Sequence, residues 1–289
     1  MMLSLYKHDN NIKFIVLCLD KKTENQLSRI NLSFIQIEKI DFLFKKYPEL
    51  KNSKNKRKKN EFCFLLTPYF IEYCLISLGN KKVFYVDSDI IFLDKCIKIT
   101  NKINKFSVIA SVHNFDKNNK FQEKINGIFN VGFLGFKRNK ISLNCLTTWK
   151  RQCLFSTTTN ESFEPIIKGD QLYLNSWPKL LKKEFYPIKD KNFNIGGWNI
   201  KNYKINYKNN QFYLNNKKVL MFHANFIEFK EKNKIFIDSR KKLKLINNFI
   251  CENYKNSSKL IKIHKIIILK ENLIIKFFSQ IKILKCFFS

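Results

Sequence analysis

Apolar runs of strand length alternate with segments of helical periodicity along most of the chain. Strands are predicted at 13–19, 34–37, 82–86, 107–112 and 129–136. Helices are predicted from Asp20 to Arg29, from Asp41, from Thr67-Pro68 to Gly79 and from Ser142 to Phe155. This alternation predicts an α/β fold with a mostly parallel mixed sheet flanked by helices, which binds its ligands beyond the carboxyl ends of the strands.

Two segments stand apart from this alternation. Residues 51–60 read KNSKNKRKKN, which has no apolar anchor and predicts a solvated loop, with closure over an anionic ligand as the alternative. Residues 259–289 consist mainly of Ile, Phe, Leu and Lys and hold seven Lys against one acid, Glu271. Two interpretations of that tail stay open: a helix packed on the domain, or a basic amphipathic helix on an anionic membrane surface. We expect one α/β domain over 1–235 and a basic amphipathic helical tail over 236–289.

The formal net charge of +31 raises the hypothesis of a basic nucleic-acid-binding protein. The residue types favour another origin. Lys supplies 49 of the 54 basic residues and Arg only 5, while Asn is present 35 times. Base and phosphate recognition favours Arg, whose planar fork forms paired hydrogen bonds. We therefore expect no nucleic-acid partner, and nucleic-acid binding remains the alternative function.

The eight cysteines form no CxxC pair, and most have apolar neighbours. This pattern excludes a clustered zinc site or a dense disulfide framework, and indicates reduced, buried thiols in a cytoplasmic protein. The first residues, MMLSLYKHDNN, are too polar for a signal peptide, and no run of 18 apolar residues occurs. We expect a cytoplasmic protein, with the inner face of the membrane as a peripheral location if the tail binds lipid.

The strongest chemical signal is the sequence VFYVDSDIIFLD. Asp87 and Asp89 flank Ser88 where a buried strand ends, so both carboxylates face the edge at which ligands bind. Two carboxylates this close repel each other unless a cation lies between them. Carboxylate oxygens suit hard divalent ions, which predicts a Mn²⁺ or Mg²⁺ site. A solvated turn after the strand is the alternative.

The chain has only seven glycines, and six of them lie in three groups after this pair of carboxylates. Each group has polar neighbours that could hold a sugar, although ordinary turns would explain any one group. The residues in question are Asn130 and Gly132 in FNVGFLGF, Gly169, Asp170 and Gln171 in KGDQLYLNSWP, and Asn194 and Trp198 in NFNIGGWNI.

His223 follows the apolar run VLMF, and a lone histidine in such a place is commonly structural. A metal site with two carboxylates lacks a third protein ligand, however, and neutral imidazole suits Mn²⁺. The sequence therefore makes His223 the candidate third ligand. The other histidines, His8, His113 and His264, have no comparable setting.

Taken in order, these segments resemble bacterial glycosyltransferases of the nucleotide-diphospho-sugar transferase (GT-A) superfamily, in the style of the retaining galactosyltransferase and glycogenin-like group. The matching segments are KFIVLCLD, EFCFLLTPYFIEYCL, KVFYVDSDIIFLD, FNVGFLGFKRN, WKRQCLF, GDQLYLNSWP, NFNIGGWNI and LMFHANF, which together span about residues 3–226. The resemblance implies a metal-assisted, retaining transfer of a sugar from a nucleotide diphosphate to a saccharide or lipid-linked acceptor, as in the synthesis of cell-surface polysaccharides.

Site roles follow from the same resemblance. It implies metal ligation by Asp87, Asp89 and His223, and contacts to donor and acceptor sugars by the Asn130 and Asp170 segments. We expect Ser88, Asn130, Gly132, Gly169, Asn194 and Trp198 to bind donor or acceptor, and Asp170 and Gln171 to act in catalysis. For Asp170, capping of the following helix is the alternative.

The resemblance also predicts a difference at the amino end. Family members begin with a strand and turn that hold the nucleotide base, whereas MMLSLYKHDN resembles the helix that follows them. We therefore expect the first strand to be missing. An inactive, truncated homologue is the second alternative function.

Overall fold

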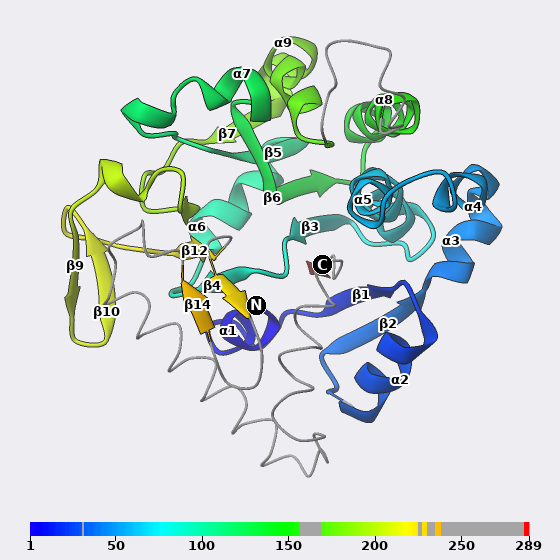
Figure 1. Ribbon diagram of the computed structural model, residues 1–289, viewed down its shortest axis with the longest axis horizontal. Helices are drawn as coiled ribbons and strands as arrows, with labels where there is room; N and C mark the ends of the chain where they lie inside the picture. The colour runs from blue at the N-terminus through cyan, green and yellow to red at the C-terminus, as the bar shows by residue number, and fades with distance from the viewer. Residues whose placement is uncertain (31, 157–168, 225–226, 230–234, 238–285, 289) are drawn as a thin grey trace.

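The computed structural model describes residues 1–30, 32–156, 169–224, 227–229, 235–237 and 286–288 (Figure 1). The helices are α1 (Met2–Tyr6), α2 (Lys21–Ile30), α3 (Ile40–Lys46), α4 (Pro48–Lys54), α5 (Lys59–Ile76), α6 (Ile97–Thr100), α7 (Gln122–Asn126), α8 (Lys140–Ser156) and α9 (Trp177–Leu181). The 3-10 helices are η1 (Asn101–Asn104), η2 (Lys117–Asn119), η3 (Leu172–Ser176), η4 (Lys182–Glu184) and η5 (Ile200–Asn202).

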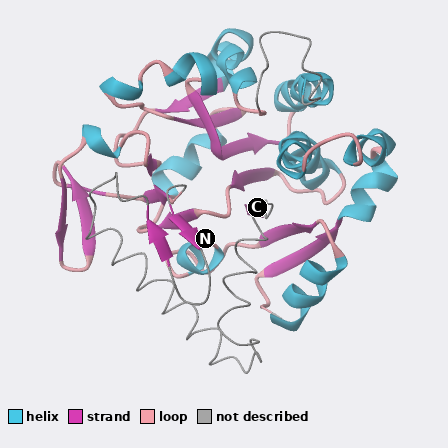
Figure 2. Ribbon diagram, viewed as in Figure 1, coloured by secondary structure: helices cyan, strands magenta, loops and turns pink. Residues whose placement is uncertain are grey.

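The strands among the described residues form one large sheet and three small ones (Figure 2). The large sheet contains β1 (Phe14–Cys18), β2 (Ile35–Lys39), β3 (Lys82–Val86), β5 (Val108–Val112), β6 (Phe129–Lys137), β7 (Phe185–Ile188) and β15 (Cys286–Phe288). The small sheets contain β4 (Ile90–Phe92), β8 (Ile195–Gly196) and β12 (Met221–His223); β9 (Ile205–Lys208), β10 (Gln211–Leu214) and β11 (Lys217–Lys218); and β13 (Ile227–Phe229) and β14 (Ile235–Ile237).

The large sheet has the order β2-β1-β15-β3-β6-β5-β7. Only the β1–β2 and β5–β7 pairs are hydrogen-bonded in parallel, and the other four are antiparallel. Following these pairings across the sheet, β2, β1, β3, β5 and β7 run in one direction, while β15 and β6 run in the other. The predicted mixed α/β fold is confirmed. The sheet is mostly parallel in strand direction but not in strand pairing, because two reversed strands lie inside it.

Both faces of this sheet are buried, which explains the continuous apolar runs in the sequence. On one face, alternate residues such as Ile15 and Tyr85 pack against α3, α4, α5 and α8. On the other, the intervening residues Phe14 and Phe84 pack with α1, α2 and α6. Figure 1 shows α5 and α8 next to each other beside the sheet, where they are in contact. The sheet thus forms a middle layer between two layers of helices.

Two sequence predictions about the first helices are wrong. Residues 51–54 belong to α4, and the loop is confined to 55–58, because the preceding Leu50 is fully buried and holds the helix on the core. Thr67-Pro68 does not begin a helix but lies inside α5. An interior proline costs roughly 3 kcal/mol. Residues on all sides of α5 are buried, so packing outweighs that cost.

At the carboxyl end, 236–237 and 286–288 lie in strands, so those residues do not continue the predicted helical tail. The rest of the tail, 238–285 and 289, lies outside the described residues, and its helical form stays a prediction. Strand β15 pairs antiparallel with both β1 and β3. Its Cys-Phe-Phe sequence has the aromatic character that favours strands. Of the predicted buried thiols, Cys18, Cys63, Cys74, Cys96, Cys145 and Cys153 are free and buried. None of the described helices has the length and hydropathy needed to cross a membrane.

Candidate metal centre

The DSD segment lies where the chain passes from the large sheet to a small one. Strand β3 ends at Val86, and β4 begins at Ile90 in the sheet β4-β12-β8. The turn is held by backbone hydrogen bonds from Asp87 N–H to the Gly132 carbonyl (3.0 Å) and from Ile90 N–H to the Asp87 carbonyl (3.2 Å). Asp87 and Asp89 remain partly exposed. The two carboxylates are therefore fixed by their backbone while still open to a ligand.

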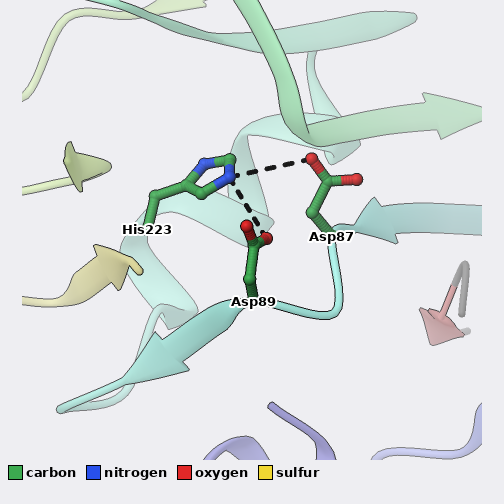
Figure 3. Close-up of side chains that lie close together, drawn as sticks. All are labelled: Asp87, Asp89 and His223. Carbon is green, nitrogen blue, oxygen red and sulfur yellow. Dashed lines mark ion pairs between the residues drawn. The ribbon is translucent and has the colours of Figure 1, made fainter. Parts of the chain in front are cut away.

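Strand pairing brings His223 to the same place. Strand β12 runs antiparallel to β4 with His223 opposite Ile90, and the Ala224 N–H donates to the Asp89 carbonyl (2.8 Å). The His223 Nε2 lies 3.2 Å from Asp89 Oδ1 and 3.8 Å from Asp87 Oδ2 (Figure 3). Each of the three side chains offers a ligand atom within 4.8 Å of the other two.

The carboxylates of Asp87 and Asp89 place negative charge next to the His223 ring. Burial alone would lower its pKa, but the charge and hydrogen bond of Asp89 and the charge of Asp87 raise the pKa above its ordinary value. The Tyr85 hydroxyl donates to Asp87 Oδ1. Burial raises the pKa of Tyr85, as do the charges of Asp87, Asp170 and Asp89. Negative charge therefore accumulates around one point at the end of β3.

These three side chains fit a divalent cation. Ligand atoms around one octahedral ion, with bonds of about 2.1 Å, lie about 3 to 4 Å apart. The separations of 3.2 and 3.8 Å from His223 Nε2 fall in that range. Two carboxylates and an imidazole form a ligand set that can hold a divalent cation. The structure thus brings together the three residues that the sequence proposed as ligands.

Gly132 touches two of the three candidate ligands. Its carbonyl accepts from Asp87 N–H, and its Cα faces the His223 ring. A Cβ added at Gly132 would lie 2.5 Å from His223 Cε1 and 2.6 Å from His223 Nδ1. It would also lie 2.5 Å from Asn130 Oδ1, which accepts the Gly132 N–H at 3.0 Å. Glycine is therefore required at position 132 because it has no Cβ and lets the backbone approach the His223 ring this closely.

The NFNIGGWNI segment contains β8, which lies on the side of β12 away from β4. Strand β8 pairs with β12, with Gly196 next to His223, and the Trp198 ring meets the imidazole edge to face at 5.0 Å. Asn194 is buried in a left-handed conformation (φ 55°) and donates to Ser111 Oγ and Asn130 Oδ1. Asn130, Asn194 and Trp198 thus lie around the centre, although the two Asn side chains are buried.

The segment 169–171 contacts helix α8. The Trp149 indole N–H donates to the Asp170 carbonyl (2.9 Å), and Asp170 is buried. Gly169 has φ 104°, a conformation that favours glycine. Gln171 is half-buried and is the N-cap residue of η3, which has no side-chain cap. The N-cap position of η3 is thus taken by Gln171 and not by Asp170. Ser88, in the DSD turn, is half-buried.

Sequence reasoning missed His113. The residues around His113 in the sequence do not indicate a functional site. In the structure its side chain is buried (3% exposed) and forms a hydrogen bond with Asn130. Its position, directly after the apolar strand β5, is like that of His223 at the end of β12. That parallel was a usable signal. Its hydrogen-bond partners could not have been found from the sequence because they come from other segments of the chain.

Comparisons with known proteins give distant relatives. No family model matches the chain. Two Bacillus subtilis (strain 168) proteins named Uncharacterized protein YfnD and Uncharacterized protein YfnF are each 26% identical over 227 residues. The match to YfnD covers 77% of this chain and 71% of that protein, and the match to YfnF covers 76% and 73%. In overall structure the chain is similar to the apo form of mouse Xyloside xylosyltransferase 1, with a TM-score of 0.46 and 10% identity over 78% of this chain and 89% of that one.

Proposed function

We propose that the chain is a metal-dependent glycosyltransferase with a GT-A type domain over residues 1–235. It transfers a sugar from a nucleotide diphosphate to a saccharide or lipid-linked acceptor. The observation that carries the proposal is the cluster of Asp87, Asp89 and His223 at the end of β3. A site of this kind suits an anionic ligand that arrives with its own divalent cation, as a nucleotide diphosphate does.

The reaction needs little from the protein beyond binding and charge. The bond between the anomeric carbon and the diphosphate oxygen breaks, and its electron pair leaves with the diphosphate. A bond from the acceptor oxygen to the anomeric carbon forms, and the acceptor hydroxyl passes its proton to the departing diphosphate. A bound Mn²⁺ or Mg²⁺ would supply neutralisation of the charge on the departing diphosphate. Asp87, Asp89 and His223 would hold that ion. Retention of configuration is proposed on the sequence resemblance alone.

We assign roles to the other candidate site residues according to how exposed their side chains are. Ser88 and Trp198 are half-buried and are proposed to contact donor or acceptor. Asn130 and Asn194 were expected to grip a sugar, but their amides bond to other protein groups. We propose that these two asparagines support the donor site from the protein interior. Asn130 does so by accepting a hydrogen bond from the Gly132 N–H. We propose that Asp170, together with Gln171 and the turn at Gly169, stabilises positive charge at the anomeric carbon.

The tail is proposed as the part that meets an anionic membrane surface. Residues 259–285 contain seven Lys against Glu271. They lie outside the described residues, so the proposal rests on charge and apolar content. It places the enzyme at the inner face of the membrane, next to a lipid-linked acceptor.

The direct test is binding of a nucleotide-diphospho-sugar in the presence and absence of Mn²⁺, by calorimetry. We expect binding to need the cation, and Asp89→Asn to reduce it at least tenfold because a ligand carboxylate is lost. Asp94→Asn is the matched control. Asp94 lies just beyond β4 and pairs with Lys218 (3.1 Å) rather than with the cluster.

Equal affinity with and without a chelator would contradict the metal role. If Asp94→Asn lost as much affinity as Asp89→Asn, the loss would come from the change in net charge and not from a missing metal ligand. If the chain instead bound nucleic acid with an affinity that falls steeply with salt, while ignoring nucleotide sugars, the alternative of a basic nucleic-acid-binding protein would be favoured.

A further inference from the structure

A chain of hydrogen bonds runs from His113 to the candidate metal ligands. The His113 Nδ1 is 2.9 Å from the Gly127 carbonyl, and its Nε2 is 3.1 Å from Asn130 Nδ2. Asn130 Oδ1 in turn accepts the Gly132 N–H (3.0 Å). The Gly132 carbonyl accepts the Asp87 N–H (3.0 Å). Three hydrogen bonds therefore connect His113 to a candidate ligand that it does not touch.

The partners determine which ring nitrogen of His113 carries the proton. A backbone carbonyl can only accept, so Nδ1 donates to Gly127. Burial lowers the pKa of His113 to about 3, so the ring is neutral and Nε2 is an acceptor. Asn130 Nδ2 is then the only amide atom that can face His113, which turns Asn130 Oδ1 toward Gly132. Oδ1 accepts from Gly132 N–H and from Asn194 Nδ2, and the acceptor at His113 supports the same orientation of the Asn130 amide from its Nδ2 side.

The main chain of His113 acts on the opposite side of the centre. Its carbonyl accepts from the Trp198 indole N–H (2.7 Å) and from Asn199 Nδ2 (2.7 Å). The Trp198 ring meets His223 edge to face at 5.0 Å. The main chain of His113 thus contacts a residue, Trp198, whose ring packs against the His223 ring.

We propose that His113 is a positioning residue, which holds Asp87 and His223 in place for a divalent cation by orienting the Asn130 amide. The proposal rests on the proposed metal site. It assigns no contact with metal or substrate to His113. Its reasoning is that metal ligands held by correctly oriented partners bind metal more tightly, typically by 10- to 100-fold.

Two substitutions at His113 separate its two side-chain hydrogen bonds. His113→Asn keeps a donor near the position of Nδ1, facing Gly127, but has no acceptor for Asn130. His113→Gln carries a carbonyl oxygen near the position of Nε2 and can still accept from Asn130. The property measured is the dissociation constant for Mn²⁺ alone, from the free-ion signal in electron paramagnetic resonance, together with the thermal unfolding midpoint.

We expect His113→Asn to weaken Mn²⁺ binding about tenfold and His113→Gln to stay within about twofold of the wild type. Equal Mn²⁺ affinity in both variants and the wild type would overturn the proposal, as would an equal loss in both. These outcomes differ from failure of the metal site itself, in which the wild type binds no Mn²⁺ or Asp89→Asn binds it as tightly.

A measurement on the wild type needs no variant to fold. Nitrogen chemical shifts from NMR report which ring nitrogen is protonated. The proposal expects His113 to be neutral with its proton on Nδ1 at pH 7. A proton on Nε2, or a protonated ring, would overturn it because Nε2 could not then accept from Asn130.

Discussion

Gly132 and Gly135 lie in the same strand, β6, but a Cβ would meet different parts of the protein at the two positions. Gly132 lies against His223 and Asn130 Oδ1, whereas a Cβ at Gly135 would meet Ile109 Cγ1 at 2.7 Å and Phe84 Cε1 at 2.8 Å in the core. Neither has a positive φ, so the constraint is close contact rather than backbone conformation. The pair therefore allows the site and the core to be tested with the same substitution.

We expect Gly132→Ala to weaken Mn²⁺ binding at least tenfold, because the new methyl group would push the imidazole away from the two carboxylates. Gly135→Ala is the control. It should lower the free energy of unfolding by about 1 to 3 kcal/mol through overpacking and leave Mn²⁺ affinity unchanged. Calorimetry with Mn²⁺ and chemical denaturation measure the two quantities. Full Mn²⁺ affinity in Gly132→Ala would show that this contact does not position His223.

Asp170 can be tested by removing its charge alone. Asn retains much of the shape and hydrogen-bonding capacity of Asp, but it has no negative charge to stabilise a developing oxocarbenium ion. We expect Asp170→Asn to lower turnover on the order of 100-fold or more and to change donor affinity little. Asp190→Asn, at an exposed position, is the control. Turnover near that of the wild type in Asp170→Asn would remove the residue from the proposed catalytic set.

Among the elements, β15 is the one that local patterns did not indicate. Residues 286–288 insert between β1 and β3, with Phe287 opposite both Ile15 and Tyr85. The sequence predicts that the last residues are helical, and for 286–288 this prediction is wrong. A strand from the far end of the chain lies within the sheet, and only the pairing of distant segments could reveal it.

The contribution of β15 can be measured through its backbone. Phe287→Pro removes an amide N–H from a strand flanked on both sides, and we expect it to lower the free energy of unfolding by about 1 to 3 kcal/mol more than Phe287→Ala does, because a ladder hydrogen bond is lost. Both variants lose the same side chain, so the difference isolates the backbone contribution. Denaturant unfolding gives both values. Equal stability of the two variants would mean that β15 does not pair within the sheet in solution.

At the scale of the whole molecule, the buried His113 couples stability to pH. Its pKa is lowered from 6.5 to about 3 in the folded protein, so the unfolded chain binds one more proton between these values. Stability from this group is complete above about pH 6.5 and is lost as pH falls toward 3. The expected slope is about 1.4 kcal/mol per pH unit for one proton. Replacing His113 with Gln should remove that slope from the measured pH dependence of unfolding. An unchanged slope would mean that His113 takes up a proton without unfolding.

The sequence by itself determined the local elements and the candidate chemistry. Strand β3, helix α8 and the carboxylates after β3 could be predicted because apolar periodicity and strand ends are properties of neighbouring residues. The alternation of strands and helices was enough for the α/β class, since a sheet buried on both faces needs apolar runs. It could not show that α5 continues through Pro68, because the burial that offsets an interior proline comes from other segments.

Only the tertiary structure decided the geometry of the candidate centre. His223 meets Asp89 because β12 pairs with β4, and sequence patterns do not specify which distant strands pair. The same holds for His113, whose orienting contacts come from the Gly127–Asn130 segment and from Trp198. Residue type and local spacing carry the capacity for chemistry. Distances between side chains far apart in the sequence depend on strand order, register and close packing, and these are set by the fold as a whole.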